Sequence, residues 1–169
     1  MIVVVSDTSV LIDLERGAFL EAAFSLSFDL AVPDLLYARE LKDYGGEKLL
    51  KLGLRVESLG DRSTAQAVRY WKTHPALSLP DCFALSLAEE KGWTLLTGDG
   101  GLRDLTDSQS IDCHGVLWVL DELLREAIIT PKLLHEGLET IARHPRCRLP
   151  KREMQTRLEM YKKLAAKKS

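Results

Sequence analysis

Four acidic residues occupy positions from which a parallel α/β sheet would bring their side chains to the same edge. Two of them follow the short apolar runs 2–5 and 93–96, and the other two lie near the starts of predicted helices that follow prolines. Because ligands of open α/β sheets bind outside the carboxyl ends of the strands, these acids are candidates for one site. They are Asp7, Glu40, Asp81 and Asp99.

A cluster of carboxylates predicts a particular chemistry. Like charges at close range repel one another unless a cation lies between them, and oxygen-only ligands suit Mg²⁺ or Mn²⁺. Such an ion offsets the negative charge of a phosphate under attack and generates a hydroxide-like water near neutral pH. The sequence therefore favours a metal-dependent phosphate chemistry. Arg103, shortly after Asp99, is a candidate contact for the phosphate, although a surface position explains it equally well.

Each acid also has a purely structural explanation. Asp7 precedes a predicted helix and could simply cap its free amides, and Asp81 lies near the positive end of another helix dipole. Glu40 could pair on the surface with a neighbour such as Arg39. Asp99 lies among glycines that could serve only a tight turn. The joint occurrence of all four at one edge is what favours a site.

The elements that would position these acids follow from the hydrophobic pattern. Apolar runs alternate with helix-period segments, which predicts an α/β fold of three α/β/α layers with a mainly parallel central sheet. The predicted strands are 2–6, 30–32, 54–59, 93–97 and a weak one near 110–113. The predicted helices are 10–15, 34–43, 62–73, 80–91, 116–126, 131–142 and 151–166.

The bulk composition excludes several classes of protein. A length of 169 residues suits one domain with an appendage, and no apolar stretch approaches the roughly 20 residues that cross a bilayer. The opening MIVVV is followed by a serine and then an acid and lacks the features of a leader, so a cytoplasmic location is expected. The histidines and the three cysteines lack zinc-site spacing, and a disulfide framework is not expected.

Charge is distributed unevenly along the chain. From Arg143 onward ten Lys or Arg residues and two Glu residues give a net charge of +8. Because the whole chain has a net charge of −2, residues 1–142 carry a net charge of −10. A basic tail on an acidic body is typical of a protein with a nucleic-acid partner. A solvated helix that pairs with the acidic body explains it equally well.

The order and spacing of these motifs resemble the PIN domain family, which is best known for ribonuclease toxins of the VapC type. The resemblance covers about residues 1–130; residues 131–169 are expected to form a basic helical extension packed on that domain. The residues that carry the resemblance are Asp7-Thr8-Ser9, Glu40, Leu79-Pro80-Asp81 with Ala84 and Ala88, and Thr97-Gly98-Asp99.

The resemblance implies that the four acids bind one or two Mg²⁺ or Mn²⁺ ions, with Ser9 and Thr97 supporting them through hydrogen bonds. Asp104 is an extra acid nearby that is not counted among the ligands. The implied function is an endoribonuclease that hydrolyses single-stranded RNA by a metal-activated water, as the toxin of a type II toxin–antitoxin pair. A small antitoxin-like protein partner and a homodimer are implied in the same way.

Two other classes of function compete with the nuclease. A receiver domain or a DxDxT phosphatase shares the fold class, but each needs paired acids after its first strand. In this chain Asp7 stands alone at that position and is followed by Thr8-Ser9. A non-catalytic module that binds nucleic acid or protein through the basic C-terminal helix is the second alternative. Its binding would weaken steeply with salt and would need no divalent ion.

Overall fold

A parallel sheet forms the centre of the molecule, whose computed structural model describes residues 2–167. Within this range the sheet has five strands, all parallel, in the order β3-β2-β1-β4-β5. The prediction of a three-layer α/β fold with a parallel sheet is confirmed. The strands are β1 (Ile2–Ser6), β2 (Phe28–Pro33), β3 (Arg55–Glu57), β4 (Thr94–Leu96) and β5 (Cys113–His114).

Strand β1 lies in the middle of the sheet, and its valines are buried on both faces, as is typical of parallel sheets. Val4 pairs with Leu30 of β2 on one side and with Thr94 of β4 on the other. From β1 the chain adds β2 and β3 on one side of the sheet and then crosses to the other side of β1, where it adds β4 and β5. The direction in which strands are added therefore reverses between β1 and β4. Such a switch point is where α/β sheets bind ligands.

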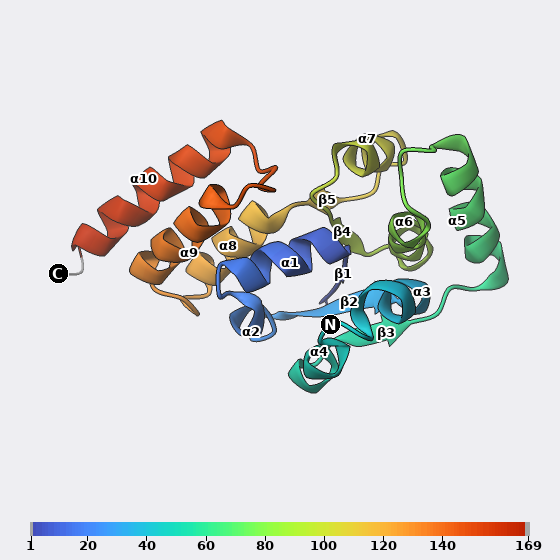
Figure 1. The fold of residues 1–169 in the computed structure, drawn as a ribbon, viewed down its shortest axis with the longest axis horizontal. Helices are drawn as coiled ribbons and strands as arrows, with labels where there is room; N and C mark the ends of the chain where they lie inside the picture. The colour runs from blue at the N-terminus through green and yellow to red at the C-terminus, as the bar shows by residue number, and fades with distance from the viewer. Residues whose placement is uncertain (1, 168–169) are drawn as a thin grey trace.

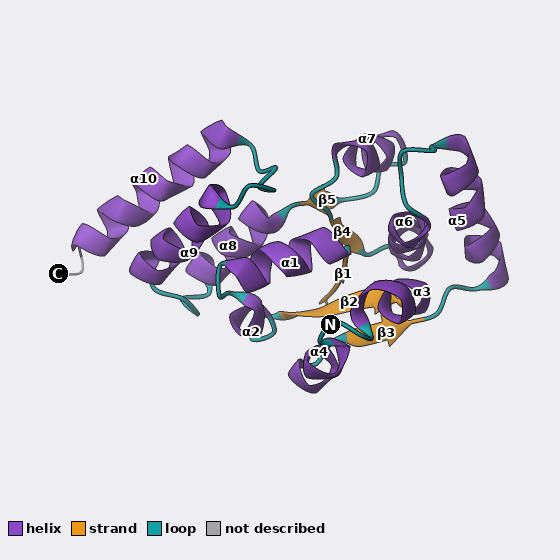
Figure 2. Ribbon diagram, in the orientation of Figure 1, coloured by secondary structure: helices purple, strands orange, loops and turns teal. Residues whose placement is uncertain are grey.

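Helices cover both faces of the sheet (Figures 1 and 2). Helix α6 packs against the central strands with α3 and α5 beside it, whereas α1, α8 and α9 pack together on the other face and α10 lies outside α9. The helices are α1 (Thr8–Arg16), α2 (Leu20–Ala23), α3 (Asp34–Leu36), η1 (Tyr37–Leu41), α4 (Gly46–Leu52), α5 (Asp61–Thr73), α6 (Leu79–Lys91), α7 (Gly100–Ser108), α8 (Val116–Arg125), α9 (Pro131–Arg143) and α10 (Lys151–Lys167).

Several elements differ from the sequence-based expectation. The predicted helix 34–43 is a short α3 followed by one π-helical turn, η1. Helices α2, α4 and α7 were not predicted. Helix α7 begins within the glycine-rich segment around Asp99, for which the sequence predicted a turn. Helix α7 has a clear physical basis, since Asp99 caps it and its buried Leu102 and Leu105 face the core.

The C-terminal helices pack closely on the body. Gly137 of α9 lies so near Phe19 that a Cβ atom there would meet its ring at 2.2 Å. Arg157 of α10 donates to both carboxylate oxygens of Asp121 of α8, over 2.8 and 2.7 Å. The boundary between a domain at 1–130 and an extension at 131–169 stays a prediction.

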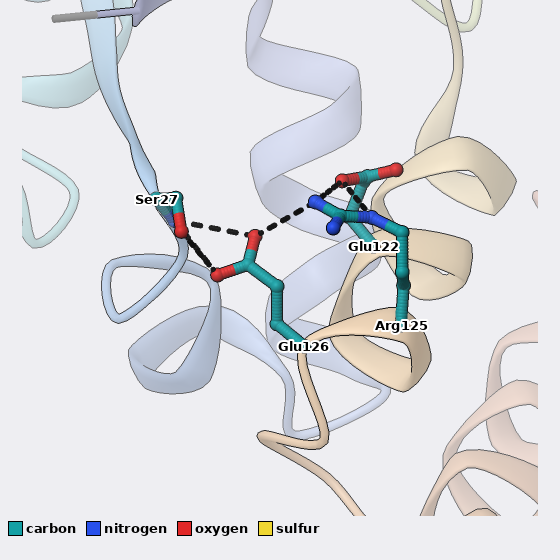
Figure 3. A network of polar contacts seen from close by, with 4 residues as sticks. All are labelled: Ser27, Glu122, Arg125 and Glu126. Carbon is teal, nitrogen blue, oxygen red and sulfur yellow. Dashed lines mark hydrogen bonds and ion pairs between the residues drawn. The ribbon is translucent and has the colours of Figure 1, made fainter.

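The end of α8 is also tied to the start of β2 (Figure 3). Glu126 accepts hydrogen bonds from the amide and the hydroxyl of Ser27, and Arg125 contacts both Glu122 and Glu126. These contacts lie at the opposite end of the strands from the candidate site. In the described chain, 2–167, every helix is too short or too polar to cross a membrane.

Candidate active site

Asp7 lies at the carboxyl end of β1 and is only 2% exposed. Its Oδ1 accepts hydrogen bonds from the Ser9 hydroxyl at 2.8 Å and from the Val10 amide at 3.0 Å, so it caps α1. Its Oδ2 accepts a bond from the Thr97 hydroxyl at 2.5 Å. Burial raises the pKa of Asp7, and these hydrogen bonds act in the opposite direction. Asp7 is therefore a cap and also a fixed carboxylate shared between two strands.

The segment after β4 is organised by Thr97 and Asp99. The Thr97 hydroxyl accepts a hydrogen bond from the Asp99 amide at 3.0 Å while it donates to Asp7. Asp99 Oδ1 caps α7 by accepting from the Leu102 amide at 2.9 Å. The backbone at Gly98 runs close to Ser9, and a Cβ there would lie 3.1 Å from the Ser9 hydroxyl. This glycine allows the two strand ends to approach each other.

Asp81 reaches the same region from α6. Ser78 caps this helix by accepting a bond from the Asp81 amide, and a side-chain hydrogen bond also links Ser78 to the Asp81 carboxylate. Burial, followed by repulsion from Asp7, raises the pKa of Asp81 to about 6, while the bond to Ser78 lowers it. Glu40 and Asp99 also raise this pKa, so the other three predicted acids all act electrostatically on Asp81.

Three of the four acids line one cavity of about 250 Å³, which we call the acidic cavity. Glu40 is outside this lining and instead accepts a bond from the Thr8 hydroxyl at 2.8 Å, beside Asp7. Arg103 is exposed and donates to the Thr97 carbonyl at 3.3 Å, away from this cavity. The charged and polar residues that line the acidic cavity include Asp7, Ser9, Asp13, Arg16, Asp81, Asp99, Arg146 and Arg148.

The donor set of the acidic cavity suits a hard divalent cation, because it consists of carboxylate and hydroxyl oxygens. Within residues 2–167, no three Asp, Glu, His or Cys side chains are placed to hold one ion. Mg²⁺ commonly binds through one or two carboxylates and keeps several waters, and the phosphate of a substrate completes its shell. The residues fit such an ion, whereas ligation by all four acids stays a prediction.

Sequence reasoning missed four charged residues of this cavity, Asp13, Arg16, Arg146 and Arg148. Asp13 follows Ser9 by four positions, so both lie on one face of α1, and this spacing could have identified it. Burial raises the pKa of Asp13, and Arg16, 3.5 Å away, lowers it. Arg146 and Arg148 come from the loop after α9, and no local signal connects them with the distant acids.

One comparison with known protein families covers most of this chain. The sequence profile of a family described as PIN domain matches residues 3–163. A search of the curated proteins found no match. Among solved structures, a toxin–antitoxin complex from Klebsiella pneumoniae is 20% identical, with a TM-score of 0.41, and the alignment covers 57% of this chain and 86% of that one.

A second solved structure is a domain of a functionally unknown protein from Methanocaldococcus jannaschii. It is 23% identical with a TM-score of 0.44, and the alignment covers 68% of this chain and 91% of that one. The family assignment therefore rests on the profile, which spans nearly the whole sequence. The chain belongs to the PIN domain family.

Proposed function

We propose that this protein is a Mg²⁺- or Mn²⁺-dependent endoribonuclease that hydrolyses phosphodiester bonds of single-stranded RNA. PIN domains are generally nucleases and usually bind divalent metals. The observation that carries the proposal is the acidic cavity, in which Asp7, Asp81 and Asp99 converge from three separate elements at the carboxyl end of the sheet. RNA as the substrate, an antitoxin-like partner and homodimerisation stay predictions.

One or two of the carboxylates of Asp7, Asp81 and Asp99 would bind the ion directly and the rest through its water shell, with Glu40 beside them. When bound, a divalent ion offsets charge on the attacked phosphate and lowers the pKa of water. Its positive charge would also relieve the repulsion that raises the pKa of Asp81. The arginines on the rim would attract the phosphate backbone toward an otherwise anionic cavity.

The hydroxyl groups have a positioning function in this proposal. Thr97 and Ser9 hold the two oxygens of Asp7, so the carboxylate keeps one orientation in a low-dielectric environment. Thr8 holds Glu40 in the same way, and Glu40 would orient the attacking water. Attack in line with the leaving oxygen would yield 5′-phosphate and 3′-hydroxyl ends.

The test is cleavage of end-labelled single-stranded RNA by the purified full chain. We expect scission that requires Mn²⁺ or Mg²⁺, stops with EDTA and falls by about 100-fold or more in Asp7→Asn, because several kcal/mol of charge stabilisation depend on this site. Asp104→Asn is the matched control, since Asp104 is an exposed acid on α7. Undiminished cleavage by Asp7→Asn would refute the proposal. Salt-sensitive binding without scission would favour the non-catalytic alternative.

A further inference from the structure

A second cavity of about 560 Å³ lies beside the acidic cavity, within the roughly 300–1,000 Å³ range of small-molecule sites. Its lining includes residues of the β5–α8 segment and of the loop 144–150 that joins α9 to α10. Because His114 and Trp118 line it, we call it the aromatic cavity. Asp13, Gly98, Arg148 and Leu149 line both cavities, which therefore share one wall.

We propose that the aromatic cavity binds the nucleotide next to the scissile phosphate, with its base against His114 and its phosphate on Arg148. This inference rests on the proposed nuclease function, since it extends the path of the strand from the acidic cavity. A chain whose phosphate lies over Asp7 and Asp99 has its neighbouring nucleotide within reach of the shared wall.

Two cations in the lining of the cavity suit a phosphate, whereas Asp13 and Glu153 also line it. Arg157 lines it too, but both oxygens of Asp121 neutralise that guanidinium. In contrast, Arg103 and Arg148 have no carboxylate within ion-pair distance among residues 2–167, and both are exposed. Unpaired guanidinium groups bind phosphate oxygens with two parallel hydrogen bonds. Arg148, at the shared wall, is the better placed of the two.

The rings of the cavity suit a base. Trp118 is stacked between Phe28, at 5.5 Å, and His114, at 4.5 Å and 10° from parallel. His114 ends this stack, and its side chain is 32% exposed. Bases of single-stranded RNA stack on aromatic and imidazole rings. His114, which is partly exposed and lines the cavity, thus offers a ring on which a splayed-out base could stack.

The test is calorimetric titration of the full chain with AMP, CMP, GMP and UMP, in EDTA so that the metal contributes nothing. Ribose 5-phosphate and inorganic phosphate serve as probes without a base. We expect at least one nucleotide to bind about tenfold more tightly than ribose 5-phosphate, and Arg148→Ala to weaken it about tenfold. Arg152→Ala, an exposed cation on α10 outside both cavities, is the matched control.

His114→Gln, which keeps a polar side chain without the ring, should remove the preference for nucleotides over ribose 5-phosphate. If that variant does not fold, Arg148→Ala decides, because Arg148 is an exposed loop residue. Equal affinity of all four nucleotides and ribose 5-phosphate, or unchanged binding by Arg148→Ala, would overturn the inference.

Cleavage assays separate this inference from the proposed function. Nucleotide binding by a chain that does not cut RNA would contradict the nuclease and support the aromatic cavity as a nucleotide site. RNA cleavage with an unchanged KM in Arg148→Ala would support the nuclease and contradict the subsite.

Discussion

The hydroxyl of Thr97 donates a hydrogen bond to Asp7 Oδ2 over 2.5 Å, although 90 residues separate them in the chain. The bond joins the end of β4 to the end of β1, where the Asp7 amide also donates to the Leu96 carbonyl at 3.0 Å. One buried carboxylate is thereby held by two strands at the point where the strand order reverses. A site built on strand ends in this way is more rigid than one built on loops alone.

Thr97→Val should reduce RNA cleavage by about 10- to 100-fold, as removal of a group that orients a metal ligand typically does. Asp7 would lose its Oδ2 bond and the Asp99 amide would lose its acceptor. The control is Thr94→Val on the same strand, whose hydroxyl bonds to Asp112 instead. Comparable losses in both variants would point to a general weakening of β4. The measurement is kcat and KM on a defined RNA at saturating Mn²⁺.

Divalent ions should raise the Tm of the full chain, since a ligand that binds only the folded state stabilises it, by about 2.7 kcal/mol at 100 times its Kd. Asp99→Asn should abolish most of this shift and Glu40→Gln a smaller part, because Glu40 lies outside the acidic cavity. Asp112→Asn serves as the control. Equal shifts in wild type and Asp99→Asn would remove Asp99 from the ligands.

Asp81 predicts a pH-dependent stability of the metal-free protein. Its pKa is about 6 when folded against an ordinary value of 3.8, so the folded state binds the proton more tightly than the unfolded chain. Below about pH 4 the carboxyl of Asp81 is protonated in both states, so it does not lower the free energy of unfolding. Between about pH 4 and pH 6 its ionisation lowers the free energy of unfolding progressively, and above that range the loss stays constant. In EDTA, Asp81→Asn should match wild type near pH 4 and exceed its stability by roughly 1–3 kcal/mol at pH 7. Denaturant unfolding at both pH values measures this; equal differences at both would contradict it.

Gly137→Ala should destabilise the packing of α9 on the body. A Cβ at Gly137 would lie 2.2 Å from the Phe19 ring and 2.5 Å from the Gly17 carbonyl, and backbone cannot move aside easily. Overpacking of this kind costs typically about 1–3 kcal/mol, which lowers Tm by roughly 2–12 °C for a chain of this length. Gly100→Ala is the control, because its Cβ would meet no atom within 4 Å. An unchanged Tm for Gly137→Ala would contradict this prediction, because it would show that α9 can move away from Phe19 and Gly17 without loss of stability.

Much of this architecture was accessible from the sequence. The valine-rich run 2–5 is apolar enough to be buried on both faces, and the alternation of runs with helix-period segments predicted the parallel sheet correctly. Because parallel strands end at one edge, this pattern also predicted that Asp7 and Asp99 lie close together. Helix α7 escaped prediction because the glycines around Asp99 were interpreted as a tight turn, although Leu102, Leu105 and Thr106 follow at helical spacing.

The sequence by itself determined the sheet and the elements that carry the acids, because hydrophobic periodicity and strand direction are local properties. Only the tertiary structure decided that Glu40 lies beside the acidic cavity rather than in its wall, and that Arg146 and Arg148 reach its rim. The packing of α9 on α1 carries that loop to the site, and the packing depends on contacts between residues far apart in the chain, such as Gly137 with Phe19. No local pattern encodes such contacts.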